Sequence, residues 1–271
     1  MNRAVLPLLT LGLFGMVVAD LLSDVWGSHS PAPAEATSDS RPATVALEPA
    51  NPLPRPATDT AAGPATAGSA TPTIERLARL AVRQQLSRMA GLTYLDSLIA
   101  STDSVVRRWP DRTGTPLRVA IVEGGAPGYQ PRMAGYVREA LSRWEGAGIG
   151  AQFTITSDTS GAEIHVRWID HFGFDRAGQT DLTWDQAGRV RKALILLALR
   201  TNTGVTLPDA ALLTVAVHEV GHALGLPHSP DSSDVMFPAT QTGVLSDRDR
   251  RTVQVLYQLP TGPVRDLARA P

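Results

Sequence analysis

Residues 218–228 read His218-Glu219-Val220-Gly221-His222-Ala223-Leu224-Gly225-Leu226-Pro227-His228. On a helix, His218 and His222 lie one turn apart on the same face, so both imidazoles can reach one zinc ion at about 2.0–2.1 Å. Gly225 permits a sharp turn after the helix, and Pro227 stiffens the approach of His228 to the same ion. Three neutral histidines leave one tetrahedral position open for water. We therefore predict one catalytic Zn²⁺ held by these three histidines.

Glu219 directly follows the first of these histidines. A carboxylate at that position lies beside the metal rather than on it. It can take a proton from zinc-activated water and pass it to a leaving amine. We therefore expect Glu219 to be the general base and acid of a hydrolytic reaction.

The pattern of apolar residues predicts an α+β domain over residues 105–260. Strands are expected at 117–122, 151–156, 163–169, 179–184 and 190–199, and helices at 131–144, 208–224 and 247–258. Thr206 is the expected N-cap of the second helix, Gly225 is its expected C-terminal stop, and Ser246 introduces the third helix.

The extended histidine motif resembles the signature of the metzincin clan, H-E-x-x-H-x-x-G-x-x-H followed by a methionine turn. Met236 follows His228 by eight residues, within Asp234-Val235-Met236-Phe237-Pro238. Ser229 after the third histidine, and Pro238 two residues after the methionine, are similar to the matrixin family of that clan. The resemblance implies a zincin catalytic domain: a twisted, mixed five-stranded sheet with an active-site helix and a C-terminal helix. It also implies that Met236 forms an apolar floor under the zinc.

Two further segments resemble matrixins, namely the loop at 174–178 and the C-terminal helix that begins near Leu245. The resemblance implies a zinc metalloendopeptidase whose protein or peptide substrate lies extended along the edge strand at 179–184, as an added strand. Thr180 and Leu182 of that strand would then bind substrate. Pro238 would help to form the pocket for the side chain that follows the cleaved bond.

The sequence also departs from the matrixins of animals. Thr183 and Ile195 stand where histidine ligands of a second, structural zinc would fall, so we predict no second zinc. Asp175 is a candidate ligand for Ca²⁺, but no other acidic ligands are evident. The chain has no cysteine, which rules out the family's cysteine switch. The pattern is more similar to small bacterial-type members than to vertebrate ones.

The N-terminal third has a different composition. Residues 1–26 contain Arg3 and then an apolar run, which predicts a signal peptide or a membrane anchor and so an extracytoplasmic, secreted or membrane-anchored protein. Residues 27–73 are rich in Pro, Ala, Thr and Ser and predict a disordered linker. Residues 74–104 predict a helical extension, either packed on the main domain or acting as an inhibitory pro-segment. Residues 261–271 are expected to be a tail.

The overall charge narrows the choice of partners. The 25 basic and 26 acidic residues give a net charge of −1 without a long basic run, which argues against nucleic-acid binding. A monomer is expected. Two other functions stay open: a binding module that kept the zinc fold without catalysis, and a zinc hydrolase that acts on another substrate, such as a cell-wall peptide. The presence of Glu219 argues against the first.

Overall fold

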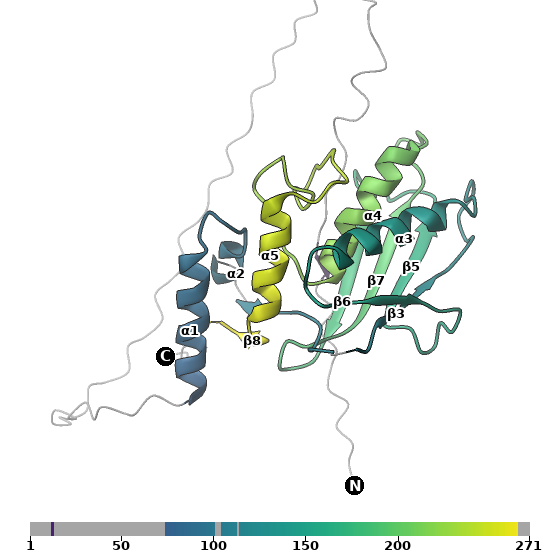
Figure 1. The fold of residues 1–271 in the computed structure, drawn as a ribbon. Coiled ribbons are helices and arrows are strands. Elements are labelled where there is room, and N and C mark those ends of the chain that lie inside the picture. Colours follow the sequence, from purple (N-terminus) through teal and green to yellow (C-terminus); the bar gives the residue numbers. More distant parts are fainter. Residues whose placement is uncertain (1–11, 14–73, 101–103, 113, 265–271) are drawn as a thin grey trace, which may run out of the picture.

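The computed structural model describes residues 12–13, 74–100, 104–112 and 114–264, and its centre is one mixed β-sheet (Figure 1). Five of the strands are β3 (Leu117–Ile121), β4 (Phe153–Ile155), β5 (Ile164–Ile169), β6 (Gly178–Trp184) and β7 (Val190–Ala198). They are ordered β4-β3-β5-β7-β6. The first four are parallel, and β6 pairs with β7 in antiparallel orientation. The five-stranded mixed sheet expected from the sequence is therefore confirmed.

A sixth, two-residue strand lies on the outer side of β6. This strand, β1 (Gly12–Leu13), pairs antiparallel with β6 opposite Asp181 and Thr180. The rest of residues 1–26 and all of 27–73 lie outside the described residues, so the signal or anchor and the linker stay predictions. Within the part of the chain that is described, no helix is long and apolar enough to cross a bilayer.

Two helices stack on the sheet. The helix α4 (Asp209–Ala223) contacts β6 and β7, and α3 (Met133–Glu145) packs beside it (Figure 1). The indole of Trp144 on α3 donates a 2.8 Å hydrogen bond to the carbonyl of Val217 on α4. Because twelve of the fifteen residues of α4 are buried, this helix forms the centre of the core rather than an amphipathic cover.

The remaining elements lie on the other side of α4. They are α5 (Asp247–Gln258), the N-terminal helices α1 (Ile74–Arg88) and α2 (Asp96–Ala100), and a small antiparallel pair of β2 (Val105–Val106) with β8 (Gly262–Pro263). Figure 1 shows α1 and α2 beside α5, away from the sheet. The strand β8 lies in the segment that was expected to be a tail.

The helix ends confirm two expectations and correct a third. Ser246 caps α5 in a reciprocal capping box with Asp249. Gly225 follows α4 with a φ of +98°, and a Cβ there would lie 2.2 Å from the carbonyl oxygen of Arg107. The prediction that Thr206 caps α4 is wrong. The N-cap is Pro208 at a φ of −68°, and its ring gives the chain the φ that a helix start needs without a side-chain cap.

Candidate metal centre

The histidines of residues 218–228 come together in space. His218 and His222 lie one turn apart on α4, and the turn at Gly225 brings His228 back toward them. The Nε2 atom of His222 lies 3.0 Å from that of His218 and 3.2 Å from that of His228. Within the described ranges, these three side chains form the group whose ligand atoms could hold a metal ion.

Hydrogen bonds fix the tautomers of the two helical histidines. Nδ1 of His218 lies 2.7 Å from the carbonyl oxygen of Val235, and Nδ1 of His222 lies 2.8 Å from that of Leu226. A carbonyl oxygen can only accept, so each Nδ1 carries the hydrogen and each Nε2 presents a lone pair to the shared centre. A histidine that donates its other nitrogen to a backbone carbonyl is the usual arrangement around a metal.

The three imidazoles are also held in the neutral form. Burial lowers the pKa of His218 to about 3 and that of His228 to about 4, and it lowers the pKa of His222 well below its usual value. Because a histidine must be neutral to bind a metal, the site needs no deprotonation step at neutral pH. Two of the three converging nitrogens present lone pairs that repel one another without a cation between them, and the third belongs to a neutral imidazole, so the donor set fits zinc.

Glu219 points from α4 toward β6. It is fully buried, and its Oε2 atom accepts a 2.6 Å hydrogen bond from the hydroxyl of Thr180. The Oε1 atom has no hydrogen-bond partner among the described residues. Burial raises the pKa of Glu219 to about 8. Gly178 is needed at the start of β6 because a Cβ there would lie 2.4 Å from Oε1.

Arg176 also lies at this site, although the sequence provided no reason to expect it there. Its side chain is buried, its guanidinium lies 4.3 Å from the ring centroid of Phe174, and it donates a 2.8 Å hydrogen bond to Gln179. Its positive charge counteracts, in part, the effect of burial on the pKa of Glu219. The loop at 174–178 was noted for its resemblance, but nothing in the sequence pattern shows that this arginine folds inward.

Met236, the methionine of the expected turn, packs against α4. Met236 is fully buried, and a Cβ on Gly221 would lie 2.3 Å from its sulfur and 2.8 Å from the indole of Trp144. Gly221, which lies between the two helical histidines in the sequence of α4, therefore leaves room for the side chain of Met236 against the helix. The amide of Ser229 donates a 2.8 Å hydrogen bond to the carbonyl of Met236, which ties the segment after His228 to the turn.

The predicted substrate-binding residues differ in how far their side chains are buried. Thr180 and Leu182 are buried on the inner side of β6, so their side chains face the core and not the outer edge of the strand. Pro238 is half-buried, two residues after Met236. Any contribution of Thr180 and Leu182 to binding a strand therefore has to come from their backbone groups.

The positions that bear on a second zinc or on calcium have no cluster of metal-ligating side chains around them in the described parts of the chain. Ile195 is buried in β7, and Thr183 is half-buried at the end of β6. Asp175, the candidate calcium ligand, is exposed. The absence of a second zinc and the binding of calcium both stay predictions.

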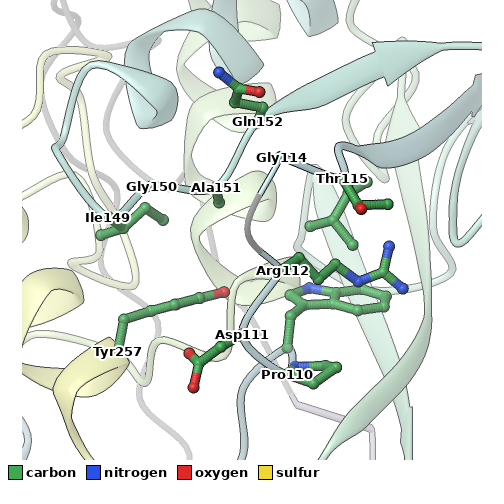
Figure 2. Close-up of a pocket in the computed structure, with 12 residues that line it drawn as sticks. Pro110, Asp111, Arg112, Gly114, Thr115, Ile149, Gly150, Ala151, Gln152 and Tyr257 are labelled. Carbon is green, nitrogen blue, oxygen red and sulfur yellow. The ribbon is translucent and has the colours of Figure 1, made fainter.

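A separate cavity of about 390 Å³ lies between α5 and the start of the sheet (Figure 2). Trp109, Arg112 and Tyr257 are among its lining residues, and neither Glu219 nor the histidines are. The indole nitrogen of Trp109 donates to the carbonyl of Ala223, and Arg112 is paired with Glu163. Because these polar groups already have partners, we assign this cavity no ligand.

Comparison with known proteins identifies a family and a curated relative. The model of the matrixin family, peptidase M10, matches residues 119–258, just over half of the chain. A curated protein of Oryctolagus cuniculus, the macrophage metalloelastase, is 50% identical over 54 residues. That match covers 18% of this chain and 12% of the relative, so the chain spans a small part of the relative's length.

Proposed function

The chain belongs to the matrixin family, and we propose that it is a zinc-dependent endopeptidase that hydrolyses peptide bonds in extended polypeptide. The observation that carries the proposal is the convergence of three neutral imidazoles on one centre, with Glu219 beside them. His218, His222 and His228 would hold the metal. When bound there, zinc would supply a Lewis acid and water of lowered pKa.

The chain's own residues support the proton transfers of such a reaction. One carboxylate oxygen of Glu219 is held by the hydroxyl of Thr180, and the other is free of protein partners in the described residues. The free oxygen can accept a proton from the attacking water and return it to the leaving amine. Burial raises the pKa of Glu219 to about 8, and the hydrogen bond from Thr180 and the positive charge of Arg176 each oppose part of that rise in favour of the ionised, proton-accepting form.

The edge of the sheet supports an extended substrate. β6 is the outer strand of the five, and β1 adds to it in antiparallel orientation opposite Thr180 and Asp181. A peptide could bind this edge through the same backbone groups, as happens when an extended peptide adds to an exposed edge strand. The substrate would then run antiparallel to β6 and pass close to Glu219, which Thr180 contacts. Pro238 would border the pocket after the cleaved bond.

Several finer points belong to the same proposal. The enzyme would act outside the cytoplasm, released or anchored through residues 1–26, as a monomer with one zinc. The catalytic domain would span residues 105–260. Matrixin relatives and the apolar N-terminal run support the location.

The test is hydrolysis of a quenched fluorescent peptide library by the full chain, with and without a zinc chelator. Glu219→Gln keeps the size of the side chain and removes its basicity. Glu139→Gln, an exposed position on α3, is the matched control. We expect the chelator and Glu219→Gln each to abolish cleavage, and the control to cleave normally. Zinc binding without cleavage of any peptide would instead support a binding module or a substrate other than protein.

A further inference from the structure

The segment before the catalytic domain packs against α5. Leu86 at the end of α1, and Tyr94 and Leu95 just before α2, are buried in the same core as the domain that follows. In Figure 1, α5 lies between these two helices and the active-site helix. The extension is therefore built into the fold on the side of α5 that faces away from α4.

Tyr94 joins the extension to α5 by two hydrogen bonds. Its phenol hydroxyl donates to Oδ1 of Asp249 at 2.9 Å, and its backbone amide donates to the hydroxyl of Thr252 at 3.4 Å. The side chain of Tyr94 is 4% exposed, so water does not compete for the phenol. Burial raises the pKa of this phenol well above its usual value, which keeps it a neutral donor.

Asp249 links this contact to the methionine turn. Its second oxygen, Oδ2, accepts hydrogen bonds of 2.9 Å from the backbone amides of Val235 and Ser246. The carboxyl group is fully buried. Because each oxygen is held by a different part of the chain, the hydroxyl of Tyr94 restricts the orientation in which Asp249 can hold the amide of Val235.

Val235 completes the connection to the metal centre. Its amide is bound by Asp249, and its carbonyl oxygen accepts the Nδ1 hydrogen of His218 at 2.7 Å. Three hydrogen bonds in series thus join the hydroxyl of Tyr94 to the first of the three histidines. Groups that orient a metal-binding histidine through its second nitrogen commonly change metal affinity by about 10- to 100-fold when they are removed.

We infer that Tyr94 is a positioning residue for the metal centre, and that residues 74–100 brace this centre rather than inhibit it. The inference rests on the proposed function, because it takes His218 to be a zinc ligand. Because the extension supports the metal centre through Asp249 and Val235, the enzyme would need it permanently, unlike a pro-segment that is removed on activation. Its removal would loosen the orientation of His218.

The experiment compares Tyr94→Phe with Tyr136→Phe in the full chain. Both variants lose one phenol hydroxyl. The hydroxyl of Tyr136 on α3 accepts a 2.8 Å hydrogen bond from Arg132 and has no described link to Val235. Zinc affinity is measured by competition with a chromophoric chelator, and peptide cleavage is measured with zinc in excess. Circular dichroism and thermal unfolding of the metal-free proteins report whether each variant folds.

We expect Tyr94→Phe to weaken zinc binding about tenfold and to lower kcat with little change in KM. The control should bind zinc within about twofold of the unaltered chain. Equal zinc affinity in Tyr94→Phe and the unaltered chain would overturn the inference, even if the variant were less stable. A chain that binds zinc tightly but cuts no peptide would refute the proposed function, and the comparison of zinc affinities would still test Tyr94.

Discussion

Gly178→Ala should damage the site while leaving the fold intact. An alanine Cβ would lie 2.4 Å from Oε1, 2.6 Å from Cγ and 2.8 Å from Cδ of Glu219, whereas ordinary contacts lie at 3.4–4 Å. The carboxylate would therefore have to move by about 1 Å, away from the 2.6 Å hydrogen bond with Thr180. A misplacement of about 1 Å can cost about 100-fold in rate, which corresponds to about 2.7 kcal/mol in the barrier.

The assay is kcat/KM on a peptide that the unaltered chain cuts, with zinc content and thermal unfolding measured beside it. We expect a loss of about 100-fold, with zinc still bound through the three histidines. Gly173→Ala is the matched control, since a Cβ there meets nothing within 4 Å. Activity of Gly178→Ala within about threefold of the control would refute the reasoning, because it would mean that the position of Glu219 does not govern the rate.

Three other changes test the packing around Met236, the binding of zinc by the histidines and the contribution of a charged aspartate to stability. Gly221→Ala should lower the free energy of unfolding by about 1–2 kcal/mol, because a crowded Met236 outweighs the gain in helix propensity. Zinc at 100 times its Kd should raise that free energy by about 2.7 kcal/mol, and His228→Ala should remove most of this gain in urea titrations. Partial burial of Asp185 raises its pKa, but hydrogen bonds, that from Arg191 foremost, outweigh this effect and lower the pKa to about 2. Asp185→Asn should therefore destabilise the protein above about pH 4, where the carboxylate is charged in both states, and this difference should vanish as the pH falls through about 2.

Each of these predictions has an outcome that would contradict it. Gly135→Ala on α3 controls for helix propensity, since a Cβ there meets nothing within 4 Å. If Gly221→Ala were as stable as this control, the contact with Met236 would be unimportant. An unchanged response of His228→Ala to zinc would argue for other ligands. A destabilisation by Asp185→Asn that is the same at pH 2 and pH 7 would show that its charge plays no part.

Much of the fold follows from local pattern. The strand segments were predictable because apolar residues alternate or run together there, as in Ile164–Ile169, and the active-site helix was predictable from its apolar run and histidine spacing. The start of that helix was predicted to within one residue, but its capping residue was not predictable. Thr206 and Pro208 are both acceptable near a helix start, and the choice depends on how the preceding chain leaves β7.

The candidate site also has one part that local sequence predicts and another that depends on tertiary packing. The spacing of His218, His222 and His228 is a local property, so the motif alone predicted that they converge. The burial of Arg176, and the contact of Thr180 with Glu219, depend on how a distant loop and strand pack on α4. No spacing within one segment encodes such contacts, and a single sequence without its fold does not show them.

The tautomers show that the geometry of the candidate metal centre depends on tertiary contacts, even though its proposed ligands are close in sequence. The helix sets which face His218 and His222 share, but it does not set which nitrogen of each ring carries the hydrogen. That choice comes from the carbonyls of Leu226, four residues after His222, and Val235, seventeen residues after His218. Since Asp249 on α5 binds the amide of Val235, a change in α5 would alter the orientation of His218, the proposed ligand, without any change in residues 218–228. Mutations that reduce zinc affinity should therefore occur on α5 and in the segment that braces it, as well as in residues 218–228.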